Sequence, residues 1–473
     1  MTSGQRRKEK DWQEVLAPKR RLEVSQLDES VWLPPAATNP FDNNTSQLTY
    51  YEIFKLATFG LVVAPLRFLI ALVTLVLATL LAKIALVGLS QEELYAKPLT
   101  PWRKRFIDSY YYLGRFMLLV LGFWWINVKG KPDPKAKIVV SNHVSFADIP
   151  FYVYYLRPAP LSRIENASIP IIKELHYGLQ AILVSRDEEA SRQNAKKTIK
   201  ERSIQPSWPP TLIFPEGTTS NGKSLITFKP GAFIPGEPVQ PVVLRFPHVH
   251  LDLCWVNGSP SPLMLVWRIL SQPVIHLEVQ FLPTHYPSQE EKQDAMLFAE
   301  NVRHRMASAL NVPVTSHSFA DVKLGLKAAN YGFPGQLTST VEVDTVQKRL
   351  GLSFDEMLAL VAKFMVINKS KDGEIKLEEF VDQFRDMNVN ENTINQFFHA
   401  LDLDNSGAID YREFLVGSVA IGNILSGKSV CPQPFTKLFE NKSFVAFWQK
   451  DHKKEADEEI QRRQQERKKA KSE

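Results

Sequence analysis

Cysteine is nearly absent from this 473-residue chain, which contains only Cys254 and Cys431. The two residues are far apart and lack metal-ligand spacing. This excludes a disulfide framework and a zinc site built from paired cysteines. Such sparse cysteine usage fits a protein of a reducing compartment.

A sustained block of basic residues is also missing. The 57 lysines and arginines are scattered among 51 acidic residues, which leaves a net charge of +6. We therefore expect no nucleic acid partner. The modest positive charge suits a protein that lies against an anionic membrane surface or binds phosphate groups.

The third absence is an unbroken apolar run of the ~20 residues that usually cross a bilayer. Residues 1–48 are polar and charged and predict a disordered tail. Residues 56–89 are almost wholly apolar, but Pro65, Arg67 and Lys83 interrupt them, and a second apolar stretch, 116–128, is short. A spanning helix, a re-entrant hairpin and a pair of interfacial helices all remain open. In each case we expect membrane-anchoring helices within residues 49–130.

Strand-like and helix-like segments alternate after residue 131. The expected strands are 137–140, 180–185, 211–214, 239–246 and 274–282. Helices are expected from about Asp148 and over 188–203. Alternation of this kind predicts an α/β sheet. In such sheets ligands bind beyond the carboxyl ends of the strands.

The segment "SNHVSFADIP" follows the first of these strands and contains His143 and Asp148. Ser145 and Asp148 also fit a helix capping box, which would be an ordinary structural feature. Pro150 argues against this reading, because proline beyond the first turn removes a helical hydrogen bond. We therefore expect the helix to begin near Asp148 and His143 to lie in the connecting loop.

Polar residues follow two further strands, namely Arg186 in "LVSRD" and Glu216 in "FPEGTTSNG". Each has a plain alternative, a helix cap for the arginine and a tight turn for the glutamate. Together with His143 they suggest a general base and a phosphate-binding arginine. No serine or cysteine sits in a nucleophile elbow, so the attacking hydroxyl belongs to the substrate, and Gly217 allows close approach of a ligand. These features suggest acyl transfer onto a phospholipid.

These residues resemble the motifs of the glycerolipid acyltransferase superfamily. Asn142, His143 and Asp148 match its N-H-x4-D motif, and "FPEGTTSNG" matches its E-G-T block. Arg186 and "PVQPVVL" (238–244) resemble its other two motifs. The stretches "LITFKPGAFIPGEPVQPVVLRFP" and "FLPTHYPSQEEK" are similar to the lysophosphatidylcholine acyltransferase branch, and the resemblance runs from about residue 45 to beyond residue 410.

The resemblance implies transfer of an acyl group from acyl-CoA to the sn-2 hydroxyl of a lysophospholipid, namely lysophosphatidylcholine, in phospholipid remodelling. It makes His143 the general base and Asp148 the residue that orients it. Arg186 would bind a phosphate, while Glu216, Gly217 and Thr218 would position the acceptor. The implied location is the endoplasmic reticulum membrane, with the Golgi and lipid droplets as alternatives.

Two segments near the C-terminus fit the twelve-residue EF-hand calcium loop. "DLDNSGAIDYREF" fits the loop at every informative position, and "NKSKDGEIKLEEF" repeats the pattern with defects such as Lys376 at position nine. The candidate ligands are Asp402, Asp404, Ser406, Ala408, Asp410 and Glu413 in the second loop, and Asn368, Ser370, Asp372, Glu374 and Glu379 in the first. We expect the second loop to bind calcium more tightly.

The sequence thus predicts an α/β acyltransferase domain (131–325) with N-terminal membrane helices, followed by an all-α EF-hand pair (340–425) and a charged tail (426–473). The expected partners are acyl-CoA, a lysophospholipid, the membrane and calcium. Acylation of lysophosphatidic acid or glycerol 3-phosphate is an alternative, as is a catalytically silent, membrane-bound calcium sensor. His143, Asp148 and Glu216 speak against the silent sensor, which would have no reason to keep all three.

Overall fold

The computed structural model describes residues 39–43, 48–185, 188–247, 251–256, 259–331 and 341–452, with residues 454 and 458. The expected disordered tail lies outside the described residues except for 39–43 and 48. The chain divides into an α/β unit, Pro40–Thr315, and a helical unit that begins at Ser316. Each unit has its own buried apolar core.

A seven-stranded mixed sheet forms the centre of the α/β unit within the described residues. The strands are β1 (Ile126–Lys129), β2 (Ile138–Ser141), β3 (Ala159–Arg163), β4 (Ile182–Val184), β5 (Thr211–Ile213), β6 (Val239–Arg245) and β7 (Leu277–Phe281). Their order is β1-β7-β6-β2-β5-β3-β4. The five strands from β6 to β4 run parallel, whereas β7 is antiparallel to β6 and parallel to β1. The predicted α/β sheet is confirmed, and every predicted strand is present.

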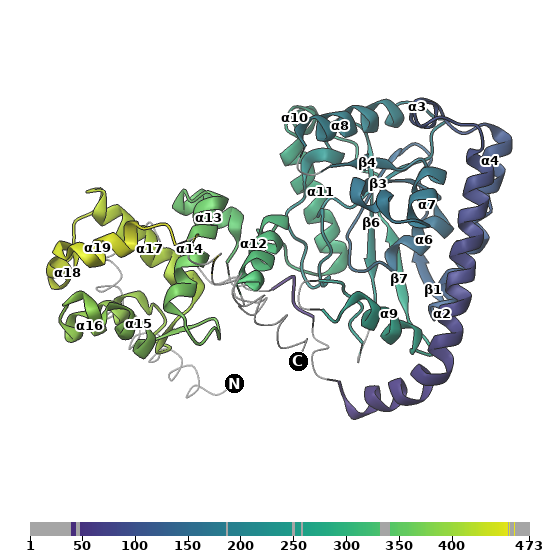
Figure 1. Ribbon diagram of the computed structural model, residues 1–473. Coiled ribbons are helices and arrows are strands. Elements are labelled where there is room, and N and C mark those ends of the chain that lie inside the picture. The colour runs from purple at the N-terminus through teal and green to yellow at the C-terminus, as the bar shows by residue number, and fades with distance from the viewer. Residues whose placement is uncertain are drawn as a thin grey trace, which may run out of the picture. The chain divides into compact units, whose positions relative to one another are not determined.

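Helices cover this sheet (Figure 1). They are α2 (Tyr50–Leu86), α3 (Gln91–Ala96), α4 (Pro101–Asp108), α5 (Tyr110–Val120), α6 (Asp148–Tyr155), α7 (Ile172–Gly178), α8 (Glu189–Ser203), α9 (Pro262–Leu270), α10 (Gln289–Gln293) and α11 (Ala295–Leu310), with 3-10 turns η4 (Ile164–Ser168) and η5 (Pro230–Ala232). Apolar residues of α8 and α11 pack against those of β2, β5 and β6 to form the core. All four residues of β2 are buried, as expected for a central parallel strand.

The long helix α2 (Tyr50–Leu86) runs along the α/β unit and contacts α4, α5, α7 and α9 (Figure 1). Its 37 residues span about 55 Å. In the described part of the chain, it is the one helix long and apolar enough to cross a membrane. Small residues, including Ala64, Ala78 and Ala82, are buried against the unit, whereas large apolar side chains such as Leu61 and Val62 are exposed.

The second apolar stretch, residues 116–128, does not form a single helix. Helix α5 ends at Val120, and β1 begins at Ile126 and pairs with β7 in the sheet. The side chains of β1 alternate between partly buried and exposed. The apolar run therefore contributes to the α/β unit, whose sheet begins before the expected boundary at residue 131.

The helical unit contains two helix–loop–helix pairs. Its helices are α12 (Phe319–Asn330), α13 (Val343–Leu350), α14 (Phe354–Ile367), α15 (Leu377–Phe384), α16 (Glu391–Leu401), α17 (Tyr411–Leu425), α18 (Thr436–Glu440) and α19 (Lys442–Gln449), with 3-10 turns η6 (Arg385–Met387) and η7 (Gln433–Phe435). The loops between α14 and α15 and between α16 and α17 carry the short strands β8 (Ile375–Lys376) and β9 (Ala408–Ile409). These strands pair antiparallel and join the two loops.

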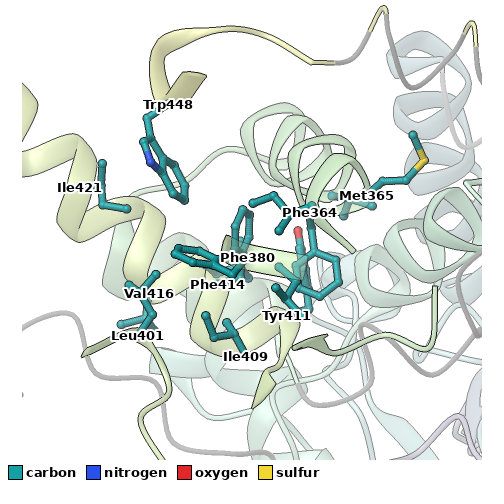
Figure 2. Close-up of a cluster of buried hydrophobic side chains, with 14 of the residues drawn as sticks. Phe364, Met365, Phe380, Leu401, Ile409, Tyr411, Phe414, Val416, Ile421 and Trp448 are labelled. Atoms are coloured by element: carbon teal, nitrogen blue, oxygen red, sulfur yellow. The ribbon is translucent and has the colours of Figure 1, made fainter. Parts of the chain in front are cut away.

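The core of this unit includes segments that we had placed outside it. Phe364, Phe414 and Trp448 lie together in Figure 2, and the Phe414 and Trp448 ring centroids are 5.7 Å apart. Trp448 belongs to α19, in the segment expected to be a charged tail. Leu324 of α12, which we had assigned to the acyltransferase domain, is buried in the same core. The helical unit is therefore larger than the expected range of 340–425.

Candidate active site

His143 and Asp148 form a hydrogen-bonded pair after β2. Helix α6 begins at Asp148, as predicted, and His143 lies in the loop before it. The histidine Nδ1 is 2.8 Å from Oδ2 of Asp148. The Asp148 side chain is fully buried, whereas 22% of the His143 side chain is exposed. This arrangement has a carboxylate orienting an imidazole that remains open to a substrate.

The same carboxylate oxygen also holds the loop. Asp148 Oδ2 accepts hydrogen bonds from the backbone N–H of Val144 (2.9 Å) and of Ser145 (3.2 Å). Because a carboxylate only accepts, it selects the tautomer of His143 with the proton on Nδ1 and leaves a lone pair on Nε2. Among the described residues, Nε2 has no protein partner, so it is free to accept a proton.

Glu216 lies at the end of the neighbouring strand β5, but it faces the protein interior. Its Oε1 accepts a hydrogen bond from the backbone N–H of His143 at 2.9 Å, and the residue has no exposed surface. Burial raises the pKa of Glu216 to about 8, and the nearby charge of Asp148 adds to this effect. The glutamate therefore contacts the backbone of the histidine.

Two further residues adjoin His143, of which Phe214 had not been recognised from the sequence and Asn142 had been noted only as part of the motif. Phe214 stacks on the imidazole, with ring centroids 4.1 Å apart and an interplanar angle of 19°. Asn142 is buried and binds the backbone of Leu244 on β6 through both its amide oxygen and its amide nitrogen. The position of Phe214 directly before the "PEG" turn was the one available sequence signal for its contact with His143.

The remaining predicted residues surround the turn after β5. Gly217 has φ +69°, and a Cβ added there would lie 2.9 Å from Cε of Lys229. Thr218 is half-buried beside it. Lys229 is exposed and places a basic side chain over this turn, a feature that we had not predicted from the sequence. Arg186 lies outside the described residues, and the strand before it, β4, is at the edge of the sheet.

The second loop of the helical unit gathers acidic groups. Asp402, Asp404 and Glu413 each offer one carboxylate oxygen, and these oxygens lie within 4.8 Å of one another. Asp410 and Glu413 exchange hydrogen bonds through a capping box, and Ser406 donates to the backbone oxygen of Ala408. Burial, with the charges of Asp410 and Asp404, raises the pKa of Glu413 to about 7.

In the first loop of the helical unit, between α14 and α15, an uncharged amide lies among the predicted ligands. The amide nitrogen of Asn368 donates to Ser370 Oγ, Asp372 Oδ1, the backbone oxygen of Glu374 and Glu379 Oε2, at 2.8–3.1 Å. Lys376 Nζ is 2.7 Å from Oδ2 of Asp372. The predicted ligands therefore converge, but their oxygens are already bound by the neutral amide of Asn368 and, in the case of Asp372, by Lys376.

Known proteins resemble this chain over most of its length. A family model described as Acyltransferase matches residues 126–245. Lysophospholipid acyltransferase LPEAT2 of Arabidopsis thaliana is 35% identical over 411 residues, which cover 85% of this chain and 74% of that protein. Lysophosphatidylcholine acyltransferase 2 of Homo sapiens is 34% identical over 415 residues, which cover 86% of this chain and 75% of that protein.

The chain belongs to the lysophospholipid acyltransferase family. A further relative, lysophospholipid acyltransferase LPCAT4 of Homo sapiens, is 39% identical over 291 residues, which cover 60% of this chain and 55% of that protein. The segment that matches the Acyltransferase model contains His143, Asp148 and Glu216. The residues that the family model covers are thus those that the fold brings together after β2 and β5.

Proposed function

We propose that this acyltransferase moves a fatty acyl group from acyl-CoA to the free sn-2 hydroxyl of lysophosphatidylcholine, as a step of phospholipid remodelling. The observation that carries the proposal is the pair formed by His143 and Asp148, with Nδ1 engaged at 2.8 Å and Nε2 open. The named activities of the relatives from Arabidopsis thaliana and Homo sapiens support the substrate class.

In the proposed reaction, Nε2 of His143 takes the proton of the acceptor hydroxyl as its oxygen attacks the thioester carbonyl. The new C–O bond forms and the C–S bond breaks. The leaving CoA sulfur then takes the proton from the imidazolium and departs as a thiol. Asp148 stabilises the imidazolium without itself being protonated.

The other predicted site residues have supporting roles. Glu216 acts as a positioning residue, because its buried carboxyl holds the backbone of His143. Gly217 and Thr218 line the turn on which the acceptor is placed. The positive φ of Gly217 allows the backbone to approach a ligand closely. Arg186 is proposed to bind a phosphate of the lysolipid or of acyl-CoA, on the strength of its motif alone.

The enzyme is proposed to work at the membrane of the endoplasmic reticulum, with the Golgi or lipid droplets as further locations. The exposed apolar side chains along α2 support membrane association, because so large an apolar face needs a non-aqueous partner. Its opposite face of small residues packs on the α/β unit. Both substrates carry acyl chains that partition into the same membrane.

Calcium is proposed as the ligand of the second loop of the helical unit, which we interpret as a pair of EF-hands. The loops fit this ion on three observations. Asp402, Asp404 and Glu413 bring carboxylate oxygens together. Gly407 has φ +84°, as the sharp turn at the sixth position requires. The short strands β8 and β9 join the two loops. Asp402 and Asp404 at the start of the loop and Glu413 of α17 would hold the ion.

The test is a transfer assay with purified membranes that contain the wild-type enzyme or His143→Ala. Long-chain acyl-CoAs and acetyl-CoA are crossed with lysophosphatidylcholine, lysophosphatidylethanolamine, lysophosphatidic acid and glycerol 3-phosphate. We expect transfer to lysophosphatidylcholine and a loss of about 10²- to 10⁴-fold in the variant, as is typical for removal of a general base. His304→Ala changes an exposed histidine of α11 and serves as the control. Activity of His143→Ala within a few-fold of wild type would contradict the mechanism.

A further inference from the structure

The segment Pro40–Asn43, which we call the strap, precedes α2 and binds two loops of the α/β unit. The first is the E-G-T loop, residues 216–222. The backbone oxygen of Pro40 accepts a hydrogen bond from Asn221 N at 2.8 Å. The backbone oxygen of Asp42 accepts from Asn221 Nδ2 at 3.1 Å. Two backbone oxygens of the strap thus hold one residue of the loop.

The second loop is residues 251–256, which we call the Cys254 loop. The amide nitrogen of Asn43 donates to Cys254 O at 3.1 Å and to Ser259 Oγ at 3.2 Å, and it lies 3.3 Å from Cys254 Sγ. Asn43 and Asn221 are more than nine-tenths buried, and Cys254 is fully buried. The strap is therefore packed into the α/β unit.

Both loops in turn bind the backbone of the loop between β2 and α6, which carries His143. Ser220 N donates to the backbone oxygen of His143 at 2.9 Å, and Trp255 N donates to that of Val144 at 3.0 Å. The hydroxyl of Thr219 donates to the backbone oxygen of Trp255 and so links the two loops to each other. Contacts therefore run from the strap, through the two loops, to the backbone oxygens of the catalytic histidine and of the residue that follows it.

We propose that the strap is a positioning element for catalysis, which fixes the E-G-T loop and the Cys254 loop and thereby the backbone at His143. The proposal rests on the proposed role of His143 as general base. A displacement of about 1 Å in a catalytic group can cost about 10²-fold in rate. Because the strap touches neither His143 nor Asp148, it acts through the two loops. Its loss lowers kcat and leaves the KM for acyl-CoA unchanged, whereas the KM for lysophosphatidylcholine rises, since the E-G-T loop also places the acceptor.

The two cysteines provide a direct measure of strap position. Cys254 is buried beneath Asn43, whereas Cys431 is half-buried in the helical unit. Asn43→Asp keeps the shape of the side chain but replaces the donor that faces Cys254 O with a second acceptor. We expect the alkylation rate of Cys254 by N-ethylmaleimide in the full-length protein to rise by about tenfold or more, with Cys431 unchanged. General unfolding would instead raise the alkylation rates of both cysteines.

The activity arm uses two truncations that differ only in the strap and the residue before it. Removal of residues 1–38 leaves the strap, and removal of residues 1–43 deletes it, while both proteins keep α2 from Tyr50. We expect the first to match wild type and the second to lose about 10- to 100-fold in kcat, the range that misplacement causes. Asn221→Asp cuts the bond to Asp42 from the other side and should lower kcat in the same way.

The outcomes separate this proposal from the proposed function. Equal kcat in the two truncations, or rapid alkylation of Cys254 in Asn43→Asp with kcat within twofold of wild type, would overturn the positioning role. If the longer truncation does not fold, the two point variants decide between the same alternatives. A wild-type protein that transfers no acyl group would refute the proposed function instead, and the alkylation arm would still report whether the strap covers Cys254.

Discussion

Asn142 binds Leu244 on both sides of its amide group: the amide nitrogen donates to Leu244 O at 2.9 Å, and Leu244 N donates to the amide oxygen at 2.8 Å. The side chain thereby continues the pairing of β2 with β6 beyond the last backbone partner, Ser141. The next residue is His143. The asparagine of the N-H-x4-D motif is thus a structural clamp at the end of the strand that carries the base.

Asn142→Asp tests this clamp with an almost isosteric change. One carboxylate oxygen can still accept from Leu244 N, but the other faces Leu244 O and has no proton to donate. A buried unpaired group of this kind costs about 1–3 kcal/mol, and we expect a lower thermal unfolding midpoint together with a fall in kcat.

Asn441→Asp is the matched control for this variant. Asn441 also uses both ends of its amide in the helical unit: the nitrogen donates to Met387 O, and the oxygen accepts from Phe444 N at the start of α19. Loss of these contacts in Asn441→Asp should lower the thermal unfolding midpoint without changing kcat. If Asn142→Asp loses no more activity than Asn441→Asp, the clamp does not position His143.

Glu216 predicts a pH dependence of stability. Its pKa is raised to about 8 in the folded protein from an ordinary value of 4.5, mainly by burial. Between these two values the folded state binds the proton and the unfolded state does not, so the contribution to stability is full below pH 4.5 and is lost as the pH rises towards 8. Glu216→Gln cannot titrate and should flatten this decline, as thermal unfolding from about pH 5 to 8 will show.

The same variant separates a positioning role from a substrate-binding role. The amide oxygen of the introduced glutamine can still accept from His143 N, so we expect Glu216→Gln to keep kcat within a few-fold of wild type near neutral pH. Glu216→Ala removes the acceptor and should lower kcat by about 10²-fold, as misplacement of the base predicts. A rise in the KM for lysophosphatidylcholine without a change in kcat would instead indicate contact with the acceptor.

The exposed face of α2 can be tested independently of catalysis. Leu69 and Val73 are more than half exposed on this helix. A charged residue in the apolar layer of a membrane costs about 2.5–3.5 kcal/mol. We therefore expect the double variant Leu69→Glu, Val73→Glu to be released by alkaline carbonate while the wild type stays in the pellet. Leu326→Glu places one such charge at a half-exposed leucine of α12 and should remain membrane-bound.

Local features of the sequence were sufficient to predict the catalytic pair. His143 and Asp148 are joined by a short loop, and Pro150 limits where the helix can begin, so their proximity follows from local geometry. The strands β2 and β5 were evident as apolar β-branched runs. Because adjacent parallel strands end at one edge, His143 and Glu216 were expected to meet, as they do.

Contacts between distant segments had no such local signature. Asn142 and Leu244 are 102 positions apart, and Asn43 and Cys254 are 211 apart. Strand β1 was missed because its residues continue the apolar run of α5 and only pairing with β7 distinguishes them. Trp448 lies in a segment rich in charge, where its role in the core depends on helices that fold elsewhere in the unit.

The last prediction is that the two loops of the helical unit bind calcium unequally. In the second loop Asp402, Asp404 and Glu413 converge, and EF-hand affinity rises with the charge of the ligands. In the first loop the uncharged amide of Asn368 lies between the ligands, and Lys376 pairs with Asp372. Glu413→Gln should therefore abolish most calcium binding in titration calorimetry of the full-length protein, whereas Glu379→Gln should abolish little. Asn368→Asp replaces the central amide with a carboxylate and should add a second measurable site. A greater loss in Glu379→Gln than in Glu413→Gln would show that ligand charge does not determine which loop binds calcium.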